Sequence, residues 1–192
     1  SIWEKTIQKI GRRYEGCTFD SFECHTDEQR RVLGMLRGYS EVIIDNVRNA
    51  GRSIVLSGPK GTGKDHLIVA LLQVAVMHSI DVHWVNGLDF FGAMRDGIGN
   101  DESEAARLKT LTAPTVLAIS DPLPPWGELS QFQSATLFRV IDTRYRQLKP
   151  TWVTVNVKDS AEAESRIGAS AIDRLRHGGL CIGMHWESYR KS

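Results

Sequence analysis

The stretch that decides the fold is Gly58-Pro59-Lys60-Gly61-Thr62-Gly63-Lys64-Asp65. The apolar run Ser53–Ser57 precedes it and predicts a strand, and the apolar residues from Leu67 to Met77 predict a helix after it. A strand, a glycine-rich loop and a helix in this order, with the pattern G-x-x-x-x-G-K, predict a phosphate-binding P-loop. The chain departs from the usual motif one position later, because Asp65 stands where Ser or Thr is expected.

Each part of this loop has a predicted role in binding a nucleotide. The glycines allow tight turns that point backbone N–H groups inward, and the first turn of the following helix adds its positive dipole end. Lys64 supplies a full positive charge for the β and γ phosphates. The sequence shows no guanine-recognition pattern, which favours ATP. The residues expected to bind the nucleotide are Gly58, Pro59, Lys60, Gly61, Thr62, Gly63, Lys64, Asp65 and His66.

Asp65 raises the question of how a magnesium ion would be held. The hydroxyl usually found there binds Mg²⁺ at the β–γ bridge, and a carboxylate is also a hard oxygen ligand. P-loop ATPases carry a second, acidic motif, usually Asp-Glu, at the end of a separate apolar strand. The corresponding strand here is 114–120, which Asp121 and Pro122 follow. Two registers of this second motif stay open.

In the first register, Ser120 takes the metal position and Asp121 takes the position of the catalytic acid. In the second register the strand is one residue longer, so Asp121 is the metal acid and Pro122 removes the catalytic one. The first register exchanges the two metal-side groups, since Asp65 brings the carboxylate and Ser120 the hydroxyl. We hypothesise that this exchange preserves Mg²⁺ binding. The alternative is that both motifs have lost their usual function, so that the domain binds nucleotide weakly and hydrolyses little ATP.

Strands alternate with helices along the rest of the chain. Further strands are predicted at 81–86, 114–120, 151–157 and 180–185, with helices at 2–13, 27–50, 64–79, 88–94, 102–111, 130–148 and 169–177. A further short helix is predicted to begin at a cap formed by Asp159 or Ser160. This alternation predicts a three-layer α/β/α fold with a parallel five-stranded sheet and ligands at the carboxyl ends of the strands. Residues 18–22 are expected to be extended and 97–100 to form a loop.

The composition excludes several classes of protein. The chain has 192 residues and a formal net charge of +1, so no global electrostatic attraction draws it to nucleic acid or membrane. It contains no apolar run of the roughly 18 residues that a membrane span needs. Three cysteines without C-x-x-C spacing predict free thiols in a reducing cytoplasm. We expect a helical N-terminal arm, residues 1–17, and one domain, residues 18–192.

Several short motifs, in their order and spacing, resemble those of a known family. They are Thr18-Phe19-Asp20-Ser21-Phe22, the P-loop with its following His66-Leu67, Thr143-Arg144-Tyr145 with Pro150-Thr151, Asn156, Ile172-Asp173-Arg174-Leu175-Arg176 and Ser188-Tyr189-Arg190. Over residues 18–190 the chain resembles the AAA+ helicase loaders of the DnaC/DnaI type and the related IstB transposition ATPases. The resemblance implies a P-loop AAA+ domain that loads or remodels a DNA-bound partner with ATP as its switch.

The resemblance also implies roles for individual residues. Asn156 falls where the family keeps its polar sensor of the γ-phosphate, and Arg174 where an arginine finger reaches the nucleotide of a neighbouring subunit. A guanidinium suits that task because it is always charged and binds phosphate oxygens as a fork. With Asp121 as the acid, these residues form the expected catalytic set, and Asp65 and Ser120 the expected Mg²⁺ ligands.

The partners are implied in the same way. They are a replicative helicase or a transposase, further copies of the chain in a nucleotide-dependent homo-oligomer, and single-stranded DNA, for which Lys109, Arg95 and Arg107 offer a modest basic group. Loaders of this type carry a separate partner-binding domain, so we expect either that it has been removed here or that the partner is held differently. A second class of function, a nucleotide-binding adaptor that does not hydrolyse ATP, is favoured by Asp65 and Ser120.

Overall fold

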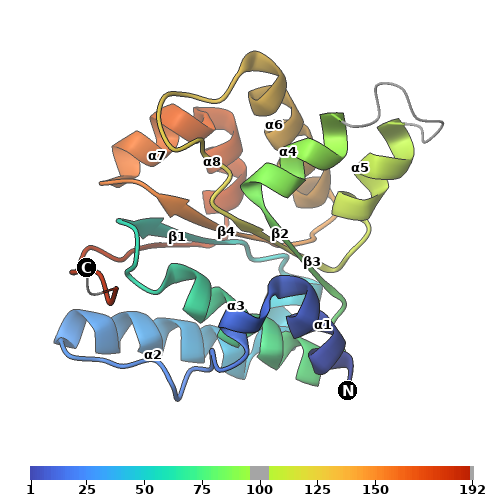
Figure 1. The fold of residues 1–192 in the computed structure, drawn as a ribbon. Helices are drawn as coiled ribbons and strands as arrows, with labels where there is room; N and C mark the ends of the chain where they lie inside the picture. Colours follow the sequence, from blue (N-terminus) through green and yellow to red (C-terminus); the bar gives the residue numbers. More distant parts are fainter. Residues whose placement is uncertain (96–103, 191–192) are drawn as a thin grey trace.

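The computed structural model describes residues 1–95 and 104–190, and only the backbone of Arg95. Its sheet has five parallel strands in the spatial order β2-β3-β4-β1-β5 (Figure 1). The strands are β1 (Ile54–Gly58), β2 (Val82–Asn86), β3 (Val116–Ser120), β4 (Thr151–Asn156) and β5 (Leu180–Gly183). The predicted parallel five-stranded sheet is therefore confirmed.

Helices cover both faces of this sheet, which gives the predicted three layers. One face carries α1 (Ile2–Ile10), α2 (Asp27–Glu41) and α3 (Lys64–Met77) (Figure 1). The other carries α4 (Gly87–Arg95), α5 (Glu104–Thr112), α6 (Gln131–Arg146), α7 (Ser160–Ile167) and α8 (Ala169–Arg176). Short helical segments η1 (Arg12–Tyr14) and η2 (Asp45–Asn49) follow α1 and α2. None of the helices in these described ranges has the length and apolar character to cross a membrane.

The apolar strands supply two cores because successive side chains of a strand point to opposite faces. On β1, Ile54 and Leu56 pack into the core on the α1–α3 face, whereas Val55 packs into the core on the α4–α8 face. On β4, Trp152 and Val153 divide in the same way. Strands buried on both faces explain why the sequence shows continuous apolar runs rather than alternation.

Two predicted elements differ in the structure. Residues 18–22 are not extended but form a turn, in which the Ser21 amide donates to Thr18 Oγ1 at 3.0 Å and the Thr18 amide to Ser21 Oγ at 2.9 Å. Hydroxyl side chains offer the backbone this alternative to extended structure. The single helix expected to reach Gly51 is interrupted after Glu41, and η2 follows as a π-helical segment. The predicted loop 97–100 lies outside the described residues.

An arginine from the quoted motifs closes the amino-terminal edge of the sheet. Arg144 of α6 has no solvent-exposed surface, and its guanidinium binds the segment before β3 and the start of β4. Its donors reach the Thr151 hydroxyl and the carbonyls of Leu111, Thr112, Pro114, Thr115 and Pro150. Burial lowers the pKa of Arg144 to about 9. The neighbouring Tyr145 is half-buried.

Candidate functional site

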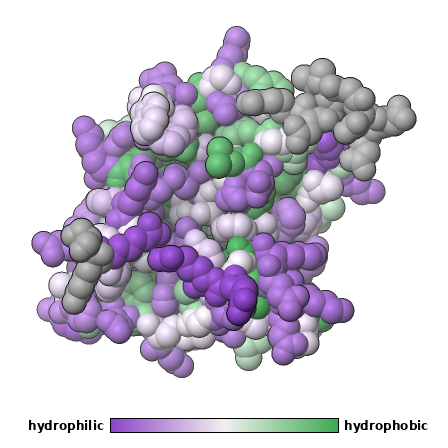
Figure 2. Space-filling model, viewed as in Figure 1, coloured by the Kyte–Doolittle hydropathy of each residue, from purple (hydrophilic) through white to green (hydrophobic). Residues whose placement is uncertain are grey.

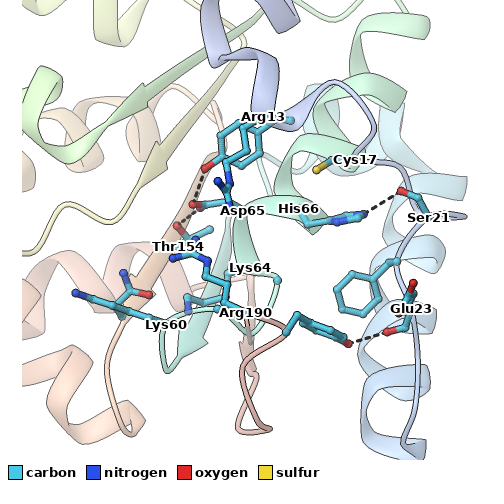
Figure 3. A pocket seen from close by; sticks show the side chains of 16 residues that line it. Arg13, Cys17, Ser21, Glu23, Lys60, Lys64, Asp65, His66, Thr154 and Arg190 are labelled. Atoms are coloured by element: carbon cyan, nitrogen blue, oxygen red, sulfur yellow. Dashed lines mark hydrogen bonds between the residues drawn. The ribbon is translucent and has the colours of Figure 1, made fainter. Parts of the chain in front are cut away.

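A cavity of about 620 Å³ lies at the carboxyl ends of β1 and β4, over the amino end of α3 (Figure 3). It is lined by Arg13, Tyr14, Cys17, Ser21, Phe22, Glu23, Lys60, Gly61, Gly63, Lys64, Asp65, His66, Thr154, Asn156, Tyr189 and Arg190. Four of these side chains are lysine or arginine and two are carboxylates, so the lining carries an excess of positive charge. Hydrophilic side chains also gather across the middle of the face shown in Figure 2. Such a lining suits a polyphosphate anion.

The P-loop backbone adopts conformations that only glycine takes without strain. Gly61 has φ +81°, and a Cβ there would lie 2.0 Å from Ser188 Oγ. Gly63 has φ +90°, and a Cβ there would lie 2.6 Å from the Phe22 ring. The two glycines therefore serve both the turn and the close approach of the C-terminal segment and the 18–22 turn to the loop.

Lys64 begins α3 and is only 5% exposed. Its Nζ donates to the carbonyls of Gly58 at 2.9 Å and Pro59 at 2.6 Å. Burial lowers the pKa of Lys64 to about 8, against the opposing effect of the Asp65 and Asp121 charges. A bound anion would offset this cost of burying the ammonium, which makes Lys64 suited to phosphate.

Asp65 lies in a cluster of hydroxyl groups from three other elements. Ser120 Oγ is 3.0 Å from both Asp65 carboxylate oxygens, and Thr154 Oγ1 donates to Oδ1 at 2.7 Å. Tyr14 donates its hydroxyl to Oδ2 at 3.4 Å. Ser120 and Thr154 meet there because they are paired in the register of β3 and β4. The structure thus brings together the two residues predicted to exchange roles.

The oxygens around Asp65 fit a magnesium ion. One carboxylate and a hydroxyl, completed by phosphate oxygens and water, is a donor set that Mg²⁺ accepts. In the described ranges, no group of three or more His, Cys, Asp and Glu side chains could hold a metal ion by itself. Mg²⁺ would therefore be held by Asp65 and Ser120 together with the nucleotide, and this ligand set stays a prediction.

Asp121, directly after β3, faces a different partner. The backbone N–H of Asn156 donates to Asp121 Oδ1 at 3.3 Å, and the Asn156 side-chain amide donates to Oδ2 at 2.5 Å. The Asp65 carboxylate accepts a hydrogen bond from Ser120, whereas Asp121 bonds to Asn156; this pairing is consistent with the first register, which stays a prediction. Asp121 has φ +46°, a conformation sparsely populated by residues other than glycine and often found at functional sites.

The C-terminal segment forms a wall of the cavity that local sequence patterns did not predict. The Tyr189 amide donates to the Gly61 carbonyl at 2.9 Å, and Trp186 Nε1 to the Thr62 carbonyl at 3.0 Å. The Tyr189 hydroxyl reaches the Glu23 carbonyl at 2.7 Å. These contacts join segments more than a hundred residues apart, so Trp186 could not be found without the fold. Tyr14 and Thr154 were missed for the same reason.

Two predicted site residues, His66 and Arg174, form their hydrogen bonds or ion pairs with groups outside the P-loop. His66 lines the cavity, but its Nε2 lies 2.8 Å from the Thr18 carbonyl and 3.2 Å from Ser21 Oγ (Figure 3). It therefore holds the 18–22 turn against α3. Arg174 of α8 is not among the cavity-lining residues. Its guanidinium binds Asp142 at 3.1 Å and Asp173 at 2.9 Å, within its own chain.

The strand order, the P-loop and the paired polar groups define the class of protein: a three-layer P-loop domain of the AAA+ type. The model of the family described as "IstB-like ATP binding protein" matches residues 14–192. The chain belongs to this family.

Curated relatives include replicative helicase loaders. The chain is 25% identical to the replicative helicase loader DnaC of Escherichia coli K12, over 97% of this chain and 75% of that protein. It is 28% identical to DnaC of Buchnera aphidicola subsp. Acyrthosiphon pisum, over 98% of this chain and 76% of that protein.

Solved structures of loaders share the fold. A crystal structure of the DnaC helicase loader matches with a TM-score of 0.80 and 22% identity, over 91% of this chain and 99% of that one. A DnaI structure matches with a TM-score of 0.76 and 16% identity, over 99% and 100% of the two chains.

Proposed function

We propose that this chain is an ATP-binding AAA+ domain that loads or remodels a replicative helicase on DNA, with ATP as the switch. The observation that carries the proposal is the cavity at the end of β1, where buried Lys64 and the Asp65–Ser120 pair converge. The similarity to replicative helicase loaders over nearly the whole chain supports the choice of partner. Since those relatives are replication proteins, we also propose that the chain acts in the cytoplasm.

The geometry of the site supports the following proposed roles. The P-loop amides and Lys64 bind the β and γ phosphates. Mg²⁺, when bound, neutralises the charge that develops between these phosphates. Asp65 and Ser120, which are joined by a hydrogen bond, would hold that ion. Asp121 orients the attacking water, and Asn156, bonded to Asp121, responds to the γ-phosphate. Arg174 completes the site of a neighbouring copy after release from its own acidic partners.

A second candidate function is a nucleotide-binding adaptor that does not hydrolyse ATP. The observation that favours it is the engagement of Asp121, whose two carboxylate oxygens both accept hydrogen bonds from Asn156. An acid held in this way is less available to orient a water. The resemblance to the IstB ATPases leaves a transposition helper as a further alternative, with a transposase as partner; the family itself is described as IstB-like ATP binding proteins.

The test compares the wild type with Lys64→Ala for ATP binding and turnover, each with and without Mg²⁺ and single-stranded DNA. We expect Lys64→Ala to bind ATP about 100-fold more weakly, which corresponds to about 2.7 kcal/mol. The matched control is Lys158→Ala, because Lys158 lies outside the cavity lining. Equal binding by wild type and Lys64→Ala would overturn the proposal. Binding without turnover would select the adaptor.

The partner is tested by reconstitution. A loader is expected to place a purified replicative helicase on single-stranded DNA in an ATP-dependent way, read as unwinding of an adjacent duplex. A transposition helper would instead stimulate strand transfer by its transposase. Sedimentation with and without ATP, for wild type and Arg174→Ala, tests whether nucleotide drives assembly.

The basic group predicted to bind single-stranded DNA consists of Lys109, Arg95 and Arg107. The side chain of Arg95 lies outside the described residues.

A further inference from the structure

We propose that the N-terminal arm, residues 1–17, is part of the nucleotide site, and that Arg13 binds the phosphates of the nucleotide so that occupancy fixes the arm on the domain. This inference rests on the proposed binding of ATP. It adds a residue that lies outside the P-loop and outside every motif of the family resemblance.

The arm is anchored at two places. At the first, Ile7 and Ile10 of α1 are each 6% exposed and pack into the same core as α2 and α3. At the second, η1 brings Tyr14 against the ring of Trp84, with ring centroids 6.2 Å apart. The Tyr14 hydroxyl donates to Asp65, the residue that follows the P-loop lysine. The arm therefore holds η1 beside the site.

This anchoring places Arg13 in the cavity wall. Figure 3 shows Arg13 entering from the N-terminal segment at the end of the cavity where Asp65 lies. Arg13 and its neighbour Arg12 are both exposed, but Arg12 does not line the cavity: its side chain is 93% exposed and lies 3.9 Å from Glu15. Within the described part of the chain, Arg13 makes no ion pair with an acidic side chain. The two adjacent arginines thus differ in what they face.

The charge around the cavity indicates what Arg13 binds. Arg13, Lys60, Lys64 and Arg190 line one space, and their mutual repulsion favours a bound anion. A guanidinium presents a fork of N–H donors that matches phosphate oxygens. A nucleoside triphosphate on the P-loop supplies those oxygens next to Asp65. Its contact with Arg13 would link the arm to the occupied site, and by linkage the docked arm would strengthen binding.

The experiment compares Arg13→Gln with the matched control Arg12→Gln. Two quantities are measured for each protein: the dissociation constant for Mg·ATP, and the hydrogen exchange of the α1 amides with and without Mg·ATP. We expect about tenfold weaker binding for Arg13→Gln, because the variant loses the charge-assisted hydrogen bonds to the phosphates. We also expect ATP to slow exchange in α1 of the wild type and of Arg12→Gln, and to lose most of this effect in Arg13→Gln.

The outcomes separate this inference from the proposed function. If the wild type binds ATP and Lys64→Ala does not, but Arg13→Gln binds and protects α1 like the wild type, the role of Arg13 is overturned while ATP binding stands. Equal losses in Arg12→Gln and Arg13→Gln would also overturn it, because they would reflect net charge alone. Failure of the wild type to bind ATP would overturn the proposed function itself. Equal denaturation midpoints of the two variants exclude misfolding as the cause.

Discussion

A cation is buried at each of the two ends of the parallel strands, and the two cations have different surroundings. At the amino-terminal edge, Arg144 has no exposed surface, and neutral acceptors surround its guanidinium. They are the Thr151 hydroxyl and five carbonyls. At the carboxyl-terminal edge, Lys64 is also buried but lines a cavity of about 620 Å³ together with the Asp65 carboxylate.

This difference indicates that the buried charge of Arg144 stabilises the fold and that the buried charge of Lys64 binds a ligand. Burial lowers the pKa of both groups, to about 9 for Arg144 and about 8 for Lys64. The acceptors of Arg144 belong to the segments that it joins, so its charge stabilises the fold. Lys64 has space beside it for an anion, so its charge remains available for binding. Substitutions at the two edges should therefore separate stability from nucleotide affinity.

The largest effect on stability is expected for Arg144→Met. It leaves five carbonyls without their charged donor in a buried place, and we expect a loss of about 3–5 kcal/mol in the free energy of unfolding. Denaturant titration measures the loss, and the ATP affinity of the remaining folded protein should be unchanged. The control is Arg146→Met, which removes an exposed pair with Asp142 and should cost less than about 1 kcal/mol. Similar losses of stability in the two variants would contradict the claim that the buried charge of Arg144 maintains the fold.

A smaller effect, at the other edge, is expected for Gly61→Ala. The new Cβ would meet Ser188 Oγ at 2.0 Å in addition to the strain of φ +81°, so we expect about 2 kcal/mol of destabilisation and about tenfold weaker ATP binding. Gly127→Ala is the matched control, because Gly127 has φ +78° and nothing within 4 Å of a Cβ. It should cost about 1 kcal/mol and leave ATP affinity intact.

A second substitution identifies the clash at Gly61. Ser188→Gly removes the hydroxyl that the new Cβ would meet, and it should restore part of the stability that Gly61→Ala loses. No recovery in the double variant would show that backbone strain alone explains the loss.

The smallest effect is expected for Trp186→Phe. The variant keeps an aromatic ring but loses the indole N–H that donates to the Thr62 carbonyl at 3.0 Å. We expect about 1 kcal/mol of lost stability and a few-fold weaker ATP binding, measured by titration and calorimetry. Trp126→Phe changes an 84% exposed side chain and should alter neither quantity. An unchanged ATP affinity in Trp186→Phe would show that the hydrogen bond from Trp186 to the P-loop does not contribute to nucleotide binding.

Much of the fold could be predicted from the sequence because its signals are local. Apolar runs buried on both faces, the capping box at Thr26 and the glycine after α8 mark where strands and helices begin and end. The 18–22 turn could not be predicted, because it depends on reciprocal bonds between Thr18 and Ser21 and on the His66 ring from another element.

The site could be predicted only in part, for a related reason. The P-loop is a contiguous motif, so Lys64 and the glycines were found directly. The Asp65–Ser120 pair was inferred by comparing two departures from an expected pattern, and the structure places their side chains 3.0 Å apart. Thr154 and Tyr14 line the cavity, and Trp186 bonds to the P-loop, without any local signal in the sequence. Each reaches its place only through the register of the sheet or the path of a terminal segment.

The most direct test of the account is the effect of Mg²⁺ on ATP affinity in the exchange series Asp65→Ser, Ser120→Asp and the double variant. We propose that Asp65 and Ser120 form one magnesium site with its two groups exchanged. We therefore expect Mg²⁺ to strengthen ATP binding in the wild type and in the double variant, by about tenfold or more, and to have little effect in either single variant. A wild-type Mg²⁺ effect that persists in Asp65→Ser, or a double variant no better than the singles, would contradict it.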